Sequence, residues 1–265
     1  MTISYSMSNE DYHNLPSISA SAVKTVAQKS LAHWKYGERK QSHAFDIGTA
    51  VHTLILEPHM AKMIWCGPET RRGNDWRDMK VAADAEGAIL LPEGEYRQAV
   101  DMAEAVRANA EAAQLLSGDL VCEASIFAHD ALHGLDLRCR PDGWRRDIDA
   151  IIDVKTTVDA SPEGFAKQVA NFGYHIQEAF YRRVMAIDGH DIDRFVFIAV
   201  EKEPPFACGV YELDWASRDE GVAAVEAALE MIQRAQTSGE FSTGYGALQT
   251  LQIPRWAFRY SNPNG

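Results

Sequence analysis

The sequence predicts an α/β fold: a mixed central β-sheet flanked by helices, with a mostly helical elaboration at the N-terminus. Three observations lead to this expectation. The first 118 residues carry mainly helical patterns, the middle of the chain contains short runs typical of strands, and a strongly periodic helix lies between two of those runs. Elements in this order are typical of a sheet covered by helices. We expect one domain over 1–265, made of the elaboration (1–118), a core (119–236) and a C-terminal tail (237–265).

The N-terminal part is expected to contain three helices. Their predicted ranges are 19–36, 45–56 and 95–116. Pro58 helps to end the second helix, because proline cannot continue the hydrogen-bonding pattern. The stretch 65–86 is polar and poorly periodic, which predicts a loop followed by a short helix.

The core is expected to contain most of the strands. The predicted strands are 120–128, 135–140, 150–156, 194–201 and 209–213. Residues 129–134 join the first two runs as a hairpin. After the third run, Ser161 and Pro162 start an amphipathic helix, with proline at the first helical position. Ser217 and Glu220 predict a capping box for a last helix, which reaches about residue 236.

The bulk composition is that of a globular protein, with 46% hydrophobic and 24% charged residues. No apolar run approaches the length needed to span a bilayer, and the first residues lack the pattern of a secretory signal. We therefore expect a cytoplasmic protein that does not enter a membrane. The 4 cysteines are scattered and form no CxxC pair, which argues against a zinc knuckle or an iron–sulfur cluster.

The residues with the clearest chemical meaning are Asp142 and the triplet Asp153-Val154-Lys155. Asp142 follows one predicted strand and Asp153 lies on the next, so adjacent antiparallel strands can bring the two carboxylates together. Lys155 is two residues beyond Asp153 and therefore points to the same side of the strand. Two carboxylates and the Val154 carbonyl suit Mg²⁺. Lys155 can then position the attacking water and stabilise the charge that develops at phosphorus.

The same residues have plainer interpretations. Asp142 precedes Gly143 and could be a turn residue, and Asp153 and Lys155 could form a surface salt bridge at a strand end. An aspartate inside an Ile-Ile-Asp-Val run is harder to explain in that way. Strand interiors disfavour aspartate, and an unpaired buried carboxylate is costly.

These residues resemble the PD-(D/E)xK nuclease superfamily, and within it the RecB-like and RecE-type exonucleases (phage exodeoxyribonuclease VIII-like). Three further segments support the resemblance. The run SISAS at 17–21, followed by a helix and then by residues 48–58, resembles phage and prophage RecE-type exonucleases. The sequence GTAVH at 48–52 is similar to the family's G-x-x-x-H helix, and QEAFY at 177–181 is similar to its Q-x-x-x-Y motif. The resemblance extends from about Ser17 to Glu201 and implies a restriction-endonuclease-like core within 119–236.

The resemblance also assigns roles to individual residues. It implies the metal ligands His52, Asp142, Asp153 and the Val154 carbonyl, the catalytic residues Asp142, Asp153, Lys155 and Glu123, and DNA contacts by Gln177 and Tyr181, with Tyr174 on the same helix face. For His52 and Glu123, the alternatives are an ordinary helix histidine and an exposed carboxylate. For the Gln177 face, the alternative is amphipathic packing.

The net charge of −12 argues against a nucleic-acid binder, because phosphate binding requires cations. An enzyme, however, needs only a local positive channel. Arginines do cluster, and we expect Arg71, Arg72, Arg77 and Arg140 to contact DNA. The alternative is that each cluster simply lies on a solvent-exposed face and does not bind DNA.

The resemblance implies a Mg²⁺-dependent exonuclease, with Mn²⁺ as a possible substitute, that degrades linear double-stranded DNA from its ends. It further implies 5′-to-3′ polarity, single-stranded DNA left for recombination, a RecT-like single-strand annealing partner and a ring-shaped homo-oligomer. Two alternatives remain: a structure-specific endonuclease on the same fold, and a non-catalytic DNA-binding module. The chain has no G-x-x-x-x-G-K-[ST] motif, so ATP bound to a P-loop of this chain would not drive its movement along DNA.

Overall fold

The structure is a computed structural model that describes residues 2–38, 43–246 and 248–258. Within these residues, the central sheet has five strands in the order β11-β10-β9-β8-β5. The strands are β5 (Leu120–Cys122), β8 (Gly143–Arg145), β9 (Ala150–Thr157), β10 (Arg194–Glu201) and β11 (Cys208–Tyr211). β9 pairs in parallel with β10 and antiparallel with β8, so the sheet is mixed, as expected.

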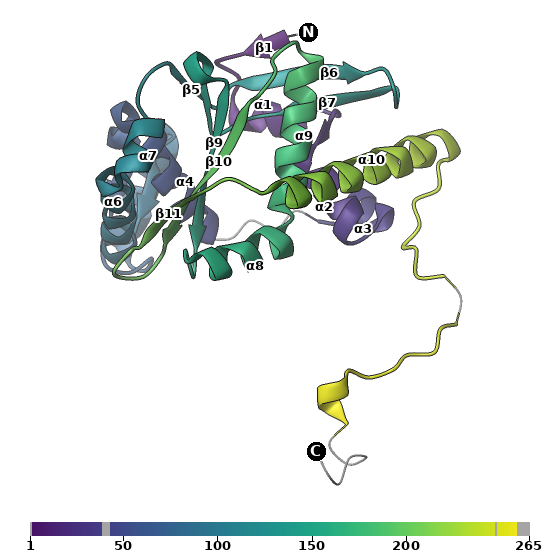
Figure 1. Cartoon of the computed structure of the whole chain (residues 1–265). Helices are drawn as coiled ribbons and strands as arrows, with labels where there is room; N and C mark the ends of the chain where they lie inside the picture. The colour runs from purple at the N-terminus through teal and green to yellow at the C-terminus, as the bar shows by residue number, and fades with distance from the viewer. Residues whose placement is uncertain (1, 39–42, 247, 259–265) are drawn as a thin grey trace.

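Helices cover both faces of this sheet (Figure 1). Those that pack on it are α4 (His43–Leu56), α6 (Glu93–Ala108), α7 (Ala110–Leu115), α8 (Pro162–Phe172) and α9 (Tyr174–Ile187). Two further helices, α2 (Ala20–Gln28) and α10 (Trp215–Ser238), pack against α9 and against each other. The α8–α9 pair forms the crossover that a parallel connection from β9 to β10 requires. Near-continuous apolar runs in β9 and β10 reflect burial on both faces.

The alternation of side chains along the strands divides the interior into two cores. Ile151 and Phe197 pack with α2, α9 and α10 on one face. Ile152 and Val154 pack with α4, α6 and α7 on the other. Asp153 has the parity of Ile151 and therefore faces α9.

A second sheet, with four strands in the described part of the chain, has the order β1-β6-β7-β2. Its strands are β1 (Thr2–Ser4), β2 (Ile18–Ser19), β6 (Ser125–Asp130) and β7 (Leu135–Cys139). β6 and β7 form the expected hairpin. The N-terminal part also contains the helices α1 (Asn9–Asn14) and α3 (Leu31–Tyr36). It therefore supplies two edge strands as well as helices, which its helical patterns did not predict.

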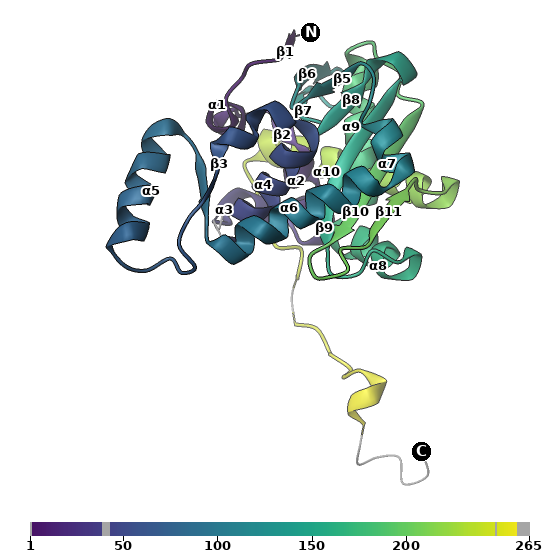
Figure 2. The same cartoon turned by 90° about the vertical axis from the view of Figure 1, so that its left-hand side faces the viewer.

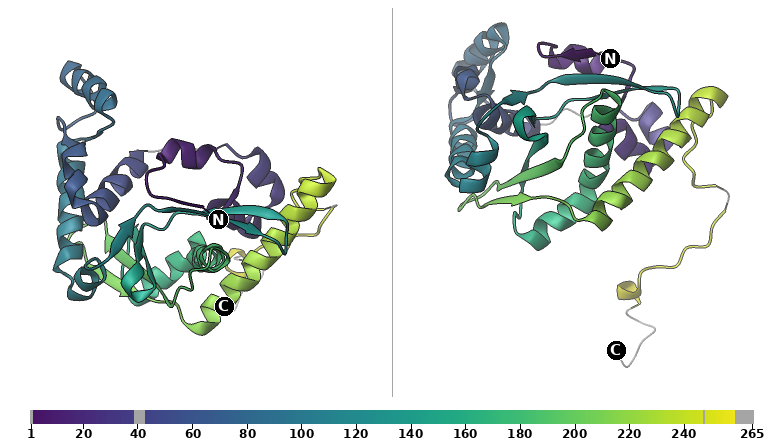
Figure 3. Two further views of the ribbon diagram at one scale, coloured as in Figure 1. Left: turned by 90° about the horizontal axis from the view of Figure 1, so that it is seen from above. Right: turned by 45° about the horizontal axis from the view of Figure 1, so that its top comes forward.

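A separate projection, here called the arm, comprises residues 64–91. β3 (Ile64–Cys66) and β4 (Ile89–Leu91) pair in parallel and are connected by α5 (Asn74–Glu86). Trp76 of α5 packs on a small cluster with Leu90, and the helix stands away from the body of the molecule (Figures 2 and 3). The expected short helix in 65–86 is therefore 13 residues long.

Three expected helices are each interrupted once. The predicted helix 19–36 is two helices, because Ser30 caps α3 with its side chain. The alanine-rich helix is α6 followed by α7, which Asn109 caps in the same way. The helix after the third strand breaks at Gly173, whose φ of 63° is left-handed and suits glycine.

Two strand and cap expectations also need correction. The predicted strand 120–128 splits at Glu123 into β5 and β6, which belong to different sheets. The last helix is capped by Asp214, which accepts a hydrogen bond from the Ser217 backbone N–H at 2.9 Å. The Ser217–Glu220 capping box is therefore wrong, because an aspartate three residues earlier takes the cap position. The short helical turns are η1 (Pro58–Met63), η2 (Arg146–Ile148) and η3 (Arg255–Ala257).

The helices differ from membrane-spanning segments. None of those in the described ranges combines the length and the apolar character needed to cross a bilayer.

Candidate active site

Asp142 and Asp153 come together where β8 meets β9. Asp142 directly precedes β8, whose first residue, Gly143, is opposite Ile152. The Asp142 Oδ2 atom accepts a hydrogen bond from the Val154 backbone N–H at 2.8 Å. Asp142 is therefore fixed beside the strand that carries Asp153, as the sequence predicted. β8 itself was not expected, since three residues are too few to give a strand pattern.

His52 reaches the same place from α4. Its Nδ1 atom lies 3.5 Å from Asp142 Oδ2. The side chain is partly exposed, at 29%, so it borders the site rather than lying in the core. The G-x-x-x-H helix is therefore adjacent to Asp142.

Asp153 is fully buried, with an exposed fraction of 0%. Its Oδ2 atom accepts a hydrogen bond from Gln177 Nε2 at 2.5 Å, and its Oδ1 atom forms an ion pair with Lys155. Burial, only partly opposed by the Lys155 ammonium, raises the pKa of Asp153 to about 6. For Lys155, burial acts to lower the pKa, but Asp153 and Asp142 outweigh it and raise the pKa above its usual value. Lys155 is thus held as an ammonium.

Glu123 adds a third carboxylate. It lies between β5 and β6 with a φ of 53°, a left-handed conformation that is costly for a residue with a side chain. Its backbone N–H donates to the Asp142 carbonyl at 3.2 Å. Burial, followed by the Asp142 charge, raises the pKa of Glu123 to about 8. Burial and the neighbouring carboxylates therefore favour the protonated form of Glu123 in the protein alone.

Glu57 is a further acidic neighbour, which sequence reasoning missed. It follows the last residue of α4, and its charge contributes to the raised pKa of both Glu123 and Cys122. Burial is the main cause in both cases. No sequence pattern connects Glu57 to Glu123, because the packing of α4 against β5 brings them together.

The predicted face of α9 does meet the site. The Lys155 Nζ atom lies over the Tyr174 ring, 4.9 Å from its centroid, and Gln177 holds Asp153. Tyr181 is one turn further along, where its hydroxyl donates to the Arg140 carbonyl at 3.1 Å. Tyr174 and Gln177 therefore contact catalytic candidates, whereas Tyr181 supports the backbone just before Asp142.

Lys24 of α2 is a second residue of the site that was not expected from the sequence. Its Nζ atom donates to Gln177 Oε1 at 3.3 Å and lies 5.6 Å from the Tyr174 ring centroid. Burial and the nearby Lys155 lower the pKa of Lys24 to about 8. In the sequence, Lys24 is an ordinary lysine on an amphipathic helix, so nothing there indicated its place.

The arginines lie on other elements. Arg140 is buried, and its Nε and Nη2 atoms donate to Ser125 Oγ at 2.9 and 2.6 Å. Two of its hydrogen-bond donors are therefore used within the fold. Arg71 forms an ion pair with Glu95. Arg72 and Arg77 are exposed near the start of α5. A DNA contact by any of the four remains a prediction. The three arginines of the arm belong to a different part of the fold from Asp142 and Asp153.

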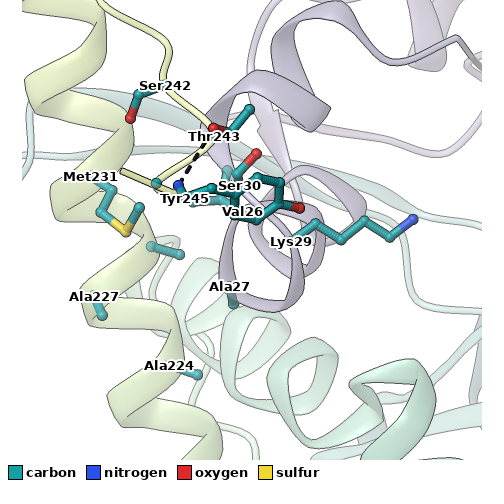
Figure 4. Close-up of a pocket in the computed structure, with 12 residues that line it drawn as sticks. Val26, Ala27, Lys29, Ser30, Ala224, Ala227, Met231, Ser242, Thr243 and Tyr245 are labelled. Atoms are coloured by element: carbon teal, nitrogen blue, oxygen red, sulfur yellow. Dashed lines mark hydrogen bonds between the residues drawn. The ribbon is translucent and has the colours of Figure 1, made fainter. Parts of the chain in front are cut away.

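A groove of about 430 Å³ lies between α2, α10 and the segment after α10 (Figure 4). Its lining includes Val26, Met231, Tyr245 and Lys29, with no carboxylate. It therefore lacks carboxylate ligands for a metal, and it is distinct from the carboxylate site.

The carboxylate site suits a divalent cation in its chemistry. Asp142 and Asp153 supply oxygen donors and His52 supplies nitrogen, and the buried Asp153 Oδ1 atom already faces one cation, the Lys155 ammonium. No three histidine, cysteine, aspartate or glutamate side chains within these residues are arranged to hold an ion. The donors are instead engaged by Lys155, Gln177 and the backbone. The types of donor nevertheless fit a divalent metal.

A mixed sheet with this Asp-Asp-Lys arrangement defines the fold as restriction-endonuclease-like, of the PD-(D/E)xK class. The chain belongs to the family described as PDDEXK-like domain of unknown function (DUF3799), whose profile matches residues 14–252. This membership confirms the fold class that the sequence predicted.

Solved structures are also similar. A candidate exonuclease from Eubacterium rectale superimposes with a TM-score of 0.65 at 16% identity, covering 94% of this chain and 96% of that one. A phage-related exonuclease from Haemophilus somnus 129PT gives a TM-score of 0.35 at 12% identity, covering 82% and 95%. The first likeness supports the fold, and the second is too low to carry an argument. No curated protein matches the chain.

Proposed function

We propose that this protein is a metal-dependent nuclease that hydrolyses DNA phosphodiester bonds. One observation carries the proposal: the buried Asp153 pairs with Lys155 on β9, while Asp142 is fixed beside this strand directly before β8. Membership in a PDDEXK-like family supports it. The similar structure from Eubacterium rectale is itself described as a candidate exonuclease.

The side chains of His52, Asp142 and Asp153, with the Val154 carbonyl, would hold Mg²⁺ or Mn²⁺. A bound cation of this kind supplies Lewis-acid chemistry: it polarises a phosphoryl oxygen and acidifies water. Glu123 would add negative charge, because a nearby cation favours its ionised form. Asp142 also accepts a hydrogen bond from the Val154 N–H. This bond holds the Asp142 carboxylate in place before a metal binds.

Lys155 would act on the reacting phosphate directly. Its ammonium is held by Asp153 and lies over the Tyr174 ring, so its position is defined before DNA arrives. A preorganised positive charge stabilises the negative charge that develops in the transition state without reorganisation. Lys155 would also donate a hydrogen bond to the attacking water and orient it toward phosphorus.

We further propose that the enzyme is an exonuclease on linear duplex DNA, with 5′-to-3′ polarity. It would leave single-stranded DNA for recombination, with a RecT-like annealing protein as partner and a homo-oligomeric ring as the working form. These finer points rest on the resemblance of the SISAS opening at 17–21, with the GTAVH, D-V-K and QEAFY segments after it, to RecE-type exonucleases. A structure-specific endonuclease would use the same residues and differ in the substrate that it accepts.

The test uses one duplex sequence in two forms, linear with a label at each end and covalently closed. Both are incubated with and without Mg²⁺. We expect the linear form alone to be degraded, only with Mg²⁺, and with loss of the 5′ label first. Cleavage of the closed form would favour the endonuclease. If neither form is cleaved with Mg²⁺ or Mn²⁺, while the protein still binds duplex DNA, the nuclease proposal is wrong and a binding module is favoured.

A further inference from the structure

Lys24 occupies an unusual position for a lysine of an N-terminal helix. It is the single charged residue within α2, and its neighbours Val23 and Val26 are buried in the core that α2 shares with α9 and α10. This packing fixes the helix against α9 and carries the Lys24 side chain to Gln177. An ammonium is thereby brought to the active site from a part of the chain outside the predicted core.

The contacts of Lys24 form a chain that ends at Asp153. Lys24 Nζ donates to Gln177 Oε1 at 3.3 Å, and Gln177 Nε2 donates to Asp153 Oδ2 at 2.5 Å. Gln177 is only 7% exposed, so water does not readily replace either partner. The two ends of one carboxamide thus connect a cation to the central carboxylate.

The direction of this amide is important for the site. A glutamine amide can rotate by half a turn and exchange its oxygen with its nitrogen. In the reversed orientation, Gln177 Oε1 would face the Asp153 carboxylate and the NH₂ group would face the Lys24 ammonium, and both contacts are repulsive. With Lys24 present, both contacts of the Gln177 amide favour the orientation in which its NH₂ group donates to Asp153 and its oxygen accepts from Lys24.

The Tyr174 ring helps to hold Lys24 in this position. Lys24 and Lys155 both lie over it, with Nζ atoms 5.6 and 4.9 Å from the ring centroid, at distances where a cation is attracted to an aromatic ring. The two lysines are nevertheless engaged differently. Lys155 pairs with Asp153 itself, whereas Lys24 reaches it only through Gln177.

We propose that Lys24 is a positioning residue of the nuclease site, which fixes the Gln177 amide so that Gln177 holds the Asp153 carboxylate in its working orientation. The proposal deepens the proposed function and rests on it wherever DNA cleavage is the measurement. A second measurement, made on the protein alone, is independent of cleavage.

The kinetic test compares Lys24→Met, Gln177→Ala and the double variant, with Lys29→Met as matched control. Lys29 is the exposed lysine that follows α2 and lines the groove. We expect Lys24→Met to lower kcat about tenfold and to leave KM for DNA within about twofold. Because Lys24 acts through Gln177, it should cause no further loss in the Gln177→Ala background.

Three kinetic results would overturn the proposal. They are a kcat for Lys24→Met equal to that of Lys29→Met, losses that add fully in the double variant, and a rise in KM that grows with salt. The last would make Lys24 a direct DNA contact. Thermal unfolding of each variant checks that α2 still packs.

The second measurement follows the Gln177 side-chain amide by NMR in protein labelled with ¹⁵N-glutamine. Its signal is assigned by its disappearance in Gln177→Ala. We expect two amide protons with shifts displaced from those of an exposed glutamine and slow exchange with solvent in the wild type and in Lys29→Met. In Lys24→Met we expect shifts nearer those of an exposed glutamine and faster solvent exchange. An unchanged signal in Lys24→Met refutes the positioning role. The expected NMR change in a protein that cleaves no DNA would refute the proposed function alone.

Discussion

The carboxylate site and the arm differ in how they hold their charged side chains. On β9, Asp153 is fully buried and is bound by both Gln177 and Lys155, so its ionisation and position depend on several elements. On the arm, Arg77 donates hydrogen bonds to the start of its own helix, at the Gly73 carbonyl and Asn74 Oδ1. Groups that react must be fixed before substrate arrives, whereas groups that attract a phosphate backbone can remain exposed. We therefore expect changes in the sheet to alter turnover and changes in the arm to alter DNA binding.

The largest expected effect tests the sheet. Asp153→Asn and, separately, Lys155→Met should lower kcat by about 10³-fold or more, because each removes a charge placed for the transition state. Asp153→Asn keeps the side-chain shape, so the protein should remain folded. Cleavage rates on linear duplex and circular dichroism on the same samples provide the measurement. Turnover close to that of the wild type in either folded variant would remove β9 from the mechanism.

His52 connects the sheet site to α4. His52→Ala should reduce cleavage by about 10–100-fold, as for residues that support a metal site, and should require more Mg²⁺ for half-maximal rate. The measurement is a Mg²⁺ titration of the initial rate, with His59→Ala as a control on a histidine of η1. Equal Mg²⁺ requirements for the two variants would show that His52 lies beside the site without supporting it.

The arm is tested by binding. The triple variant Arg71→Ala, Arg72→Ala and Arg77→Ala should weaken duplex binding most at low salt, and it should reduce the salt slope of log Kd by about one for each DNA phosphate that these arginines neutralise. The rate at saturating DNA should stay unchanged. Fluorescence anisotropy over a salt series measures the slope, with Arg97→Ala of α6 as the control.

If the triple variant keeps the wild-type slope but loses turnover, the assignment of binding to the arm and turnover to the sheet is wrong.

The smallest expected effect concerns stability. Because the pKa of Glu123 is raised to about 8 in the folded protein, its contribution to stability is present below the unfolded pKa of about 4.5 and is lost as pH rises through about 8. Metal-free protein should lose about 1–2 kcal/mol over this window, after allowance for solvent screening. Glu123→Gln should remove that part of the pH dependence. Urea unfolding in EDTA at several pH values measures it, and identical pH profiles for both proteins would contradict it.

Local sequence patterns predicted the side-chain directions that depend only on the spacing of residues along one strand or one helix. The two-residue alternation along a strand was enough to place Lys155 beside Asp153, and the spacing on a helix was enough to place Tyr174 and Gln177 on one face. The Glu57 and Lys24 contacts depend on how α4 packs on β5 and α2 on α9. No local pattern contains that information. β8 was missed for a related reason, since its three residues become a strand only through pairing with both β5 and β9.

The hydrogen bond from the Val154 N–H to Asp142 has a consequence for relatives of this protein that have lost catalysis. Asp142 satisfies a main-chain donor on the central strand, and an unpaired buried donor costs about 1–3 kcal/mol. Selection for folding alone would therefore preserve Asp142 in a pseudoenzyme. The Lys155 ammonium instead contacts side chains, those of Asp153 and Tyr174, and satisfies no main-chain group in these contacts. Among diverged copies, Lys155 is accordingly the better marker of a working enzyme.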